Sequence, residues 1–191
     1  MKKIIAIVVV LVVAAVAVFA LTGDKTPDTS SDAVTYADAT EVLTTIFAAY
    51  AEENKFPVGG GDEANQSFEA PAKYDYTLAD ELNVVVKLPA SQSANIEDAA
   101  TAMHMMNANS FTGAAYKLVD GADAAAFAAD FKTELDNTRW MCGFPEKFIV
   151  IKTGNFIVTA YGVGDIMEYF KTTTATALTG AEVILEGDVA A

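Results

Sequence analysis

The clearest structural signal in this 191-residue chain is a pair of β-rich segments joined by a tight turn. Residues 147–152 and 156–161 are rich in β-branched and aromatic side chains, and Gly154-Asn155 between them is typical of a hairpin turn. A two-stranded hairpin is only marginally stable by itself, because its apolar side chains need a partner surface. The hairpin therefore predicts a larger sheet, and we expect the domain to be built around it.

The segments that flank the hairpin extend it to a familiar order of elements. We expect a strand over residues 111–119 and a helix over 123–137 before the hairpin, then a helix over 165–178 and a strand over 182–185 after it. The order β-α-β-β-α-β is the split βαβ, ferredoxin-like plan, a four-stranded antiparallel sheet with two helices on one face. The sequence therefore predicts an α+β, ferredoxin-like core at about residues 110–187.

The preceding residues are expected to add helices to that core. Apolar positions repeat at helical spacing over residues 36–54, where Asp38 and Glu41 have capping-box spacing. A short helix from Thr77 is followed by a β-rich run over 84–88, which we interpret as a short or edge strand. A helix is expected over 96–107, with an apolar face made of Ile96, Ala99, Ala100, Met103 and Met106. Residues 36–187 are thus expected to form a single α+β domain.

The N-terminus is expected to insert into a membrane. Residues 4–21 contain no charged, hydroxyl or amide side chain, and two lysines precede them. Small residues at Val18 and Ala20 also fit signal-peptide cleavage after Ala20. Residues 1–21 are therefore predicted to be a transmembrane anchor or a signal peptide, followed by a polar linker over 22–35. The expected location is the cell membrane, single-pass with the domain outside, or secretion after cleavage near Ala20.

The negative net charge of the chain limits the classes of partner that we expect. The sequence has 12 basic and 26 acidic residues, and removal of residues 1–20 takes away two basic residues and no acidic one, which leaves a net charge of −16. Nucleic acids and anionic lipid head groups both reward basic surfaces, so neither is an expected partner of the domain. The expected partners are the membrane, through residues 4–21, and a protein or another component of the cell envelope.

Two chemical hypotheses arise from residues that occur rarely in this chain. His104, Arg139 and Cys142 are the only histidine, arginine and cysteine, and a reactive thiolate needs a positive or histidine neighbour, so they are the candidates for a thiol-dependent enzyme. Thioether, imidazole and thiolate ligands suit Cu(I). The candidates for such a soft-metal site are Met103, His104, Met106, Met141 and Cys142. The structural alternative is a methionine-rich core face and an inert buried cysteine.

The third hypothesis is a binding or envelope-structural module. Trp140 and Phe144 lie in a loop with glycine and proline, residues 139–145, where they form either a contact anchor or the lid of the local core. The rare residues do not make a convergent catalytic set, and His104 falls on a different helical face from Met103 and Met106. The sequence therefore predicts no cofactor, leaves enzymatic activity open and favours a binding module.

A glycine-rich segment offers one further candidate. Residues 59–61 are three successive glycines, but a phosphate-binding loop would continue with Lys-Ser/Thr, and here Asp62-Glu63 follows. We expect a turn, or a loop near a cation such as Ca²⁺, in place of a phosphate site.

Three unusual phrases carry a resemblance to known proteins: residues 56–66, residues 103–109 and residues 139–145. With the N-terminal apolar segment, they make the chain resemble uncharacterised membrane-tethered bacterial extracytoplasmic proteins of the domain-of-unknown-function type. The resemblance implies export and a small α+β domain. It implies no activity, cofactor or catalytic residue.

Overall fold

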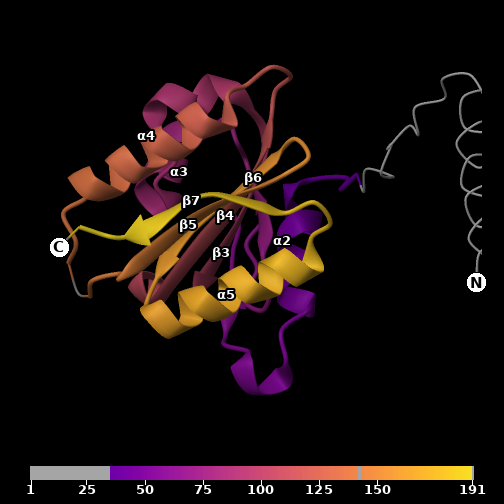
Figure 1. Cartoon of the computed structure of the whole chain (residues 1–191), viewed down its shortest axis with the longest axis vertical. Helices are drawn as coiled ribbons and strands as arrows, with labels where there is room; N and C mark the ends of the chain where they lie inside the picture. Colours follow the sequence, from indigo (N-terminus) through magenta and orange to yellow (C-terminus); the bar gives the residue numbers. More distant parts are fainter. Residues whose placement is uncertain (1–34, 142, 191) are drawn as a thin grey trace, which may run out of the picture. The chain divides into compact units, whose positions relative to one another are not determined.

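The computed structural model describes residues 35–141 and 143–190 (Figure 1). The anchor or signal peptide expected over residues 1–21, nearly all of the expected linker, and Cys142 lie outside the described residues. Within the described residues, no helix is long and apolar enough to cross a membrane.

The described chain forms one antiparallel sheet of seven strands with helices packed on both of its faces. The strand order is β1-β3-β4-β6-β5-β7, and the short β2 pairs with β3 beside β1. In chain order the elements are α2 (Ala39–Ala48), η1 (Glu52–Asn54), β1 (Val58–Gly59), β2 (Ala72–Tyr74), α3 (Ala79–Val86), η2 (Ala90–Asn95), β3 (Ile96–His104), η3 (Ala108–Ser110), β4 (Phe111–Leu118), α4 (Ala124–Asn137), β5 (Lys147–Thr153), β6 (Phe156–Gly162), α5 (Gly164–Ala177) and β7 (Glu182–Asp188).

The C-terminal half confirms the elements expected from the sequence. The predicted hairpin is β5 and β6, and the flanking strands and helices are β4, α4, α5 and β7, with ends that differ by one to three residues. Helix α4 begins where expected because the Asp123 carboxylate accepts hydrogen bonds from the N–H groups of Ala125 and Ala126, at 2.9 and 3.1 Å. An α+β fold with an antiparallel sheet is therefore established.

The strand order differs from the ferredoxin-like plan. In that plan the last strand pairs with the first, which here would place β7 beside β4. That edge of β4 is already occupied by β3, which pairs with it from Ile96↔Leu118 to Met103↔Thr112. Strand β7 pairs instead with β5, from Lys147↔Asp188 to Lys152↔Glu182. The element order was predicted correctly, but the topology is different.

This edge occupancy also explains why α4 and α5 do not share a face. Strands β4 and β6 are antiparallel to each other. Helix α4 connects β4 to β5, and helix α5 connects β6 to β7. Each connection leads to a parallel strand two places further along the sheet, and both run in the same direction across the sheet. Because such crossovers are right-handed, two crossovers from antiparallel strands in one direction must lie on opposite faces. Figure 1 shows this arrangement, with α3 and α4 on one side of the sheet and α2 and α5 on the other.

The predicted helix over residues 96–107 is in fact strand β3. Helix α2 packs on one face of this strand and α3 with α4 on the other, so Ala99, Ala100 and Ala102 are all fully buried. A strand covered on both faces loses the alternation of polar and apolar residues that identifies a half-buried strand. Without that alternation, the apolar residues of this segment happen to lie three and four residues apart, which is the spacing expected of a helix.

Residues 84–86 of the strand predicted over 84–88 are the end of helix α3, which stops at Val86. Leu82 and Val86, four residues apart, are buried against the sheet, while Val84 is 70% exposed. Burial of this helical stripe outweighs the β preference of three successive valines. Helix α2 is confirmed, with Asp38 accepting from the Glu41 N–H at 2.8 Å, although it ends at Ala48 rather than near Asn54.

The three glycines at 59–61 bring β1 close to the edge of β3. A Cβ atom on Gly60 would lie 2.0 Å from the carbonyl oxygen of Thr101, and Gly61 has a φ of +89°. The buried Asp62 carboxylate that follows accepts hydrogen bonds from the N–H groups of Ala64 (2.9 Å), Asn65 (2.9 Å) and Asp75 (2.6 Å), and from the Asn65 amide. The Asp62 carboxylate therefore connects the turn at residues 62–65 to the backbone at Asp75.

We predict that this carboxylate stabilises the fold in a pH-dependent manner. Burial raises the pKa of Asp62, but the hydrogen bonds outweigh it and hold the pKa below its usual value. The stabilisation of the fold by the Asp62 carboxylate is therefore complete above the pKa of the unfolded state, about 3.9. It is lost as the pH falls through the lower pKa of the folded state. Asp62→Ala should cost about 2 kcal/mol of unfolding free energy at pH 7.

Urea denaturation of wild type and Asp62→Ala at pH 7 and at pH 3 measures this contribution. The difference between the two proteins should shrink at the lower pH. Glu63→Ala, which removes an exposed neighbouring carboxylate, is the control and should change the stability by less than about 0.5 kcal/mol. Equal losses for Asp62→Ala at both pH values would contradict the assignment.

Candidate binding surface

Two loops that are distant in sequence meet at one end of the sheet. The first, residues 105–110, connects β3 to β4, and the second, residues 138–146, connects α4 to β5. The Asn109 side-chain amide donates to the carbonyl oxygens of Met141 at 3.0 Å and Gly143 at 3.1 Å. Asn107 in turn accepts from the Asn109 N–H at 3.0 Å, which fixes the turn that presents this amide. Two of the unusual phrases in the sequence thus become neighbours in space.

Large apolar side chains on both loops are exposed. Met106 is 81% exposed, Met141 73% and Phe144 65%. Met105 is exposed as well, and its sulfur lies over Gly59, where a Cβ atom would approach it to 2.4 Å. Side chains of this size usually face the core, so several together on one end of a domain indicate a contact surface.

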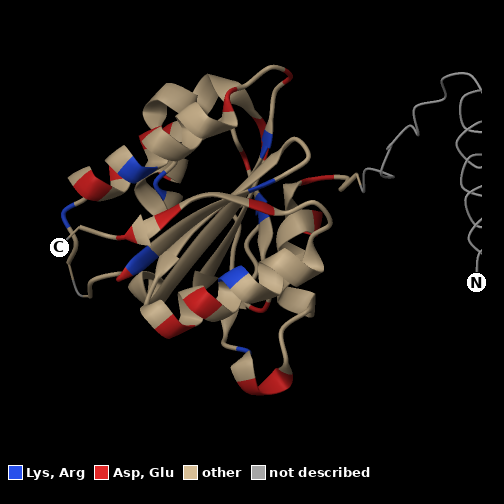
Figure 2. Ribbon diagram, viewed as in Figure 1, with Lys and Arg blue, Asp and Glu red and all other residues tan. Residues whose placement is uncertain are grey.

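Within these loops, residues 105–110 and 140–145 contain no charged residue, whereas Arg139 and Glu146 lie at the two ends of the second stretch. We use the name uncharged end for residues 105–110 and 140–145, of which Cys142 lies outside the described part of the chain. Residues 1–34 carry three lysines and three aspartates, so the rest of the chain retains the whole net charge of −14. Acidic side chains occur on the helices, strands and loops of the domain (Figure 2). Depletion of charge beside exposed Met and Phe is the composition of the centre of a protein–protein interface.

Trp140 lies under this surface and only partly within it. Its ring packs on Tyr161, with centroids 5.2 Å apart, and the Lys87 ammonium lies 5.8 Å from its centroid. Burial lowers the pKa of Lys87 and raises the pKa of Tyr161 to about 12. The indole is half-buried against the α3–α4 core cluster, so it supports the loop, whereas Phe144 projects from it.

His104 lies at the inner border of the uncharged end. Its ring is stacked on Phe56 with centroids 5.0 Å apart and an interplanar angle of 9°. Its Nδ1 accepts a hydrogen bond from the Met106 N–H at 3.1 Å, which leaves Nε2 as the nitrogen that could meet a ligand. Met103, its neighbour on β3, is partly buried.

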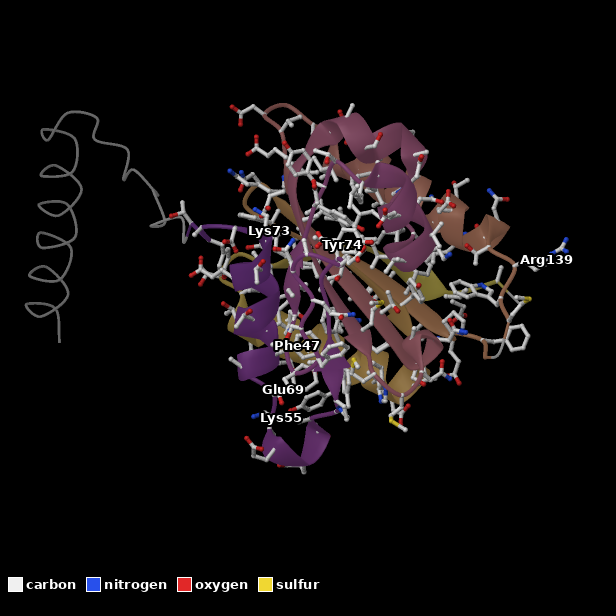
Figure 3. All side chains as sticks on the ribbon, turned by 180° about the vertical axis from the view of Figure 1, so that it is seen from behind. Phe47, Lys55, Glu69, Lys73, Tyr74 and Arg139 are labelled. Carbon is white, nitrogen blue, oxygen red and sulfur yellow. The ribbon has the colours of Figure 1, made fainter. Side chains whose placement is uncertain are left out.

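The thiol and soft-metal hypotheses stay predictions. Cys142 lies outside the described residues, and the described part of the chain contains no cluster of three or more His, Cys, Asp or Glu that could hold a metal ion. Arg139 is exposed and, within residues 35–141 and 143–190, makes no salt bridge. Figure 3 shows its side chain projecting from the domain, far from Phe47 and Lys55.

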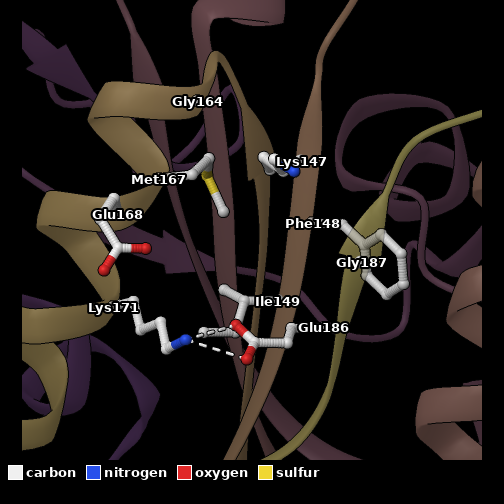
Figure 4. Close-up of a pocket in the computed structure, with 9 residues that line it drawn as sticks. All are labelled: Lys147, Phe148, Ile149, Gly164, Met167, Glu168, Lys171, Glu186 and Gly187. Atoms are coloured by element: carbon white, nitrogen blue, oxygen red, sulfur yellow. Dashed lines mark hydrogen bonds and ion pairs between the residues drawn. The ribbon is translucent and has the colours of Figure 1, made fainter.

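A cleft between α5 and strands β5 and β7 is lined by charged side chains that mostly form ion pairs. This cleft of about 180 Å³ includes Lys147, Lys171 and Glu186 (Figure 4). Lys171 pairs with Glu186 at 2.8 Å, and Lys147 pairs with Asp188. The Glu146 carboxylate accepts a hydrogen bond of 2.9 Å from the N–H of Gly164, the first residue of α5. Of the charged side chains that line the cleft, only Glu168 makes no salt bridge in the described part of the chain, so the cleft offers no convergent set of unpaired charges to a ligand.

Comparison of the chain with protein-family models, curated proteins and solved structures finds no match.

Sequence reasoning identified part of this surface. Residues 103–109 and 139–145 were singled out by their unusual composition, and Phe144 was predicted as a contact residue. The bond from Asn109 and the exposure of Met105 and Met106 were missed, because residues 96–107 were expected to form a helix with Met106 on its buried face. The run of uncharged residues from Ala99 to Tyr116 was the available signal.

We predict that Asn109 orders the loop of residues 139–145. Asn109→Asp replaces the amide that faces two carbonyl oxygens with a carboxylate that repels them, and it should cost about 1–2 kcal/mol of unfolding free energy. Trp140 is the only tryptophan, so its fluorescence reports on this loop. Its emission should shift to the red and its quenching by acrylamide should increase.

Asn155→Asp provides the matched control. It makes the same change of charge in the β5–β6 turn, at the opposite end of the sheet, and should leave the Trp140 spectrum unchanged. An Asn109→Asp protein with the emission and quenching of the wild type would show that the amide does not hold the loop.

Proposed function

We propose that the protein is an extracytoplasmic binding module, tethered by residues 4–21 or released after cleavage near Ala20, that contacts a protein partner through its uncharged end. The observation on which this proposal depends is the exposure of Met106, Met141 and Phe144 on two adjoining loop segments that contain no charged residue, in a strongly acidic domain. Burial of each such side chain in an interface stabilises a complex by about 1.5–3 kcal/mol.

The place at which the described domain begins supports this proposal. Tyr36, near the beginning of the described chain, packs on Phe156 with ring centroids 6.2 Å apart, and its hydroxyl accepts from the Thr179 N–H at 3.2 Å. These contacts lie at the end of the sheet opposite to the uncharged end, because β6 begins at Phe156 and ends at Gly162, beside Phe111. A domain tethered through residues 22–35 would thus present its apolar side chains away from its point of attachment.

The charge distribution favours a protein partner over a lipid surface. A net charge of −14 in the domain opposes approach to anionic head groups, whereas a protein interface can be centred on a neutral apolar patch with charges at its rim. Methionine side chains adapt their shape to a partner, and the half-buried Trp140 supports the loop from beneath.

Photo-crosslinking in intact cells tests this proposal. A benzophenone amino acid at position 144 or 141 should give a discrete covalent adduct with a partner. The control position is Val84, which is as exposed as Phe144 but lies on α3, outside the uncharged end. It should give no adduct. Phe144→Ser should reduce the adduct formed from position 141 at least fivefold. Equal crosslinking from positions 84 and 144, or none from 141 and 144, contradicts the proposal.

A further inference from the structure

A hollow with a largely apolar lining lies at the C-terminal end of α2. It has a volume of about 270 Å³, and the residues that line it include Phe47, Tyr50, Phe56 and Val58. Phe56 is nearly perpendicular to both Phe47 (83°) and Tyr50 (79°), and centroid separations are 5.9 and 6.0 Å. The Phe56 ring thus stands nearly perpendicular to two other aromatic rings beside a space large enough for a small organic group.

These rings form a rigid wall. Phe47 is stacked on Tyr50 with centroids 5.2 Å apart, and the far face of the cluster is held by Phe111 and by His104, which is stacked on Phe56. Tyr50 is buried, and its hydroxyl has no hydrogen-bond partner within the described residues. The Tyr50 ring lies beside Tyr169, and both rings line a second hollow. Tyr50 and Phe56 belong to the lining of both hollows. Core packing leaves this buried polar atom unexplained.

The charges at the mouth of the hollow favour a cation. Lys55 and Glu69 both border it, and Figure 3 shows them together with Phe47 near the same end of α2. The Lys55 ammonium is already paired with Glu52 at 2.5 Å, whereas Glu69 makes no salt bridge in the described part of the chain. The remaining local charge is negative, in a domain whose net charge is −14.

We infer that this hollow binds an organic cation with an apolar surface, such as a quaternary or alkylated ammonium group. Aromatic rings attract a cation within about 6 Å of their centroids, and an adjacent carboxylate adds direct charge attraction. The apolar surface of such a cation would contact Phe47, Phe56 and Val58, while Glu69 would neutralise it. The site is separate from the loops of the uncharged end and does not depend on the partner proposed for them.

Three probes with similarly bulky trimethyl groups, of which choline and its neutral carbon analogue are isosteric, separate charge from shape. The full-length protein in a non-ionic detergent is titrated with choline, with the neutral 3,3-dimethyl-1-butanol and with the anionic 3,3-dimethylbutanoate, at one fixed salt concentration. Binding is followed by NMR through the amide shifts of Phe56, Glu69 and Ala70. Choline should bind at least tenfold more tightly than either of the other probes.

Two matched variants test the assigned residues. Glu69→Gln should weaken choline binding about tenfold and leave the neutral probe unchanged, whereas Glu53→Gln, the same change on the neighbouring η1, should alter choline binding less than twofold. Phe47→Leu should weaken choline binding by a similar factor. Binding of the neutral or anionic probe as tightly as choline, equal effects of the two glutamate variants, or no binding of choline would each overturn the inference.

Discussion

The pairing of β3 with the outer edge of β4 determines most of this structure. Because β3 occupies that edge, β7 must pair with β5, and the right-handed crossover through α5 then lies on the face opposite α4. The sheet is consequently covered on both faces, by α2 and α5 on one side and by α3 and α4 on the other. The same pairing places the β3–β4 loop where Asn109 can bind the loop that leads into β5.

The sequence was sufficient where local signals decide structure and insufficient where packing decides it. The turn at Gly154-Asn155 and the cap at Asp123 are local, so β5, β6 and α4 could be predicted with nearly correct ends. Ala99 and Ala100 gave no signal of a strand, because a strand buried on both faces does not alternate. Strand order could not be predicted either, since it depends on which edge an unrecognised strand occupies. Phe144 was found from its unusual loop, whereas the exposure of Met106 required the correct structure of β3.

The two proposed sites use different parts of one aromatic and apolar region. His104 joins them, because its ring is stacked on Phe56 of the hollow while its Nδ1 holds the backbone of Met106 at the uncharged end. An acidic surface suits both sites. It repels other copies of the domain and anionic membranes, it attracts cations to the hollow, and it leaves the uncharged end as the surface on which a partner can bury apolar side chains at low desolvation cost.

The most direct test of the central claim is the accessibility of the uncharged end in intact cells. Phe144→Cys and Val84→Cys, each in a Cys142→Ser background, are labelled with a membrane-impermeant thiol reagent. We predict rapid labelling of both positions in the purified protein, and in intact cells labelling of position 84 with protection of position 144. Equal labelling of both positions in cells would contradict a bound partner at this surface, and labelling of position 84 only after lysis would contradict an extracytoplasmic domain.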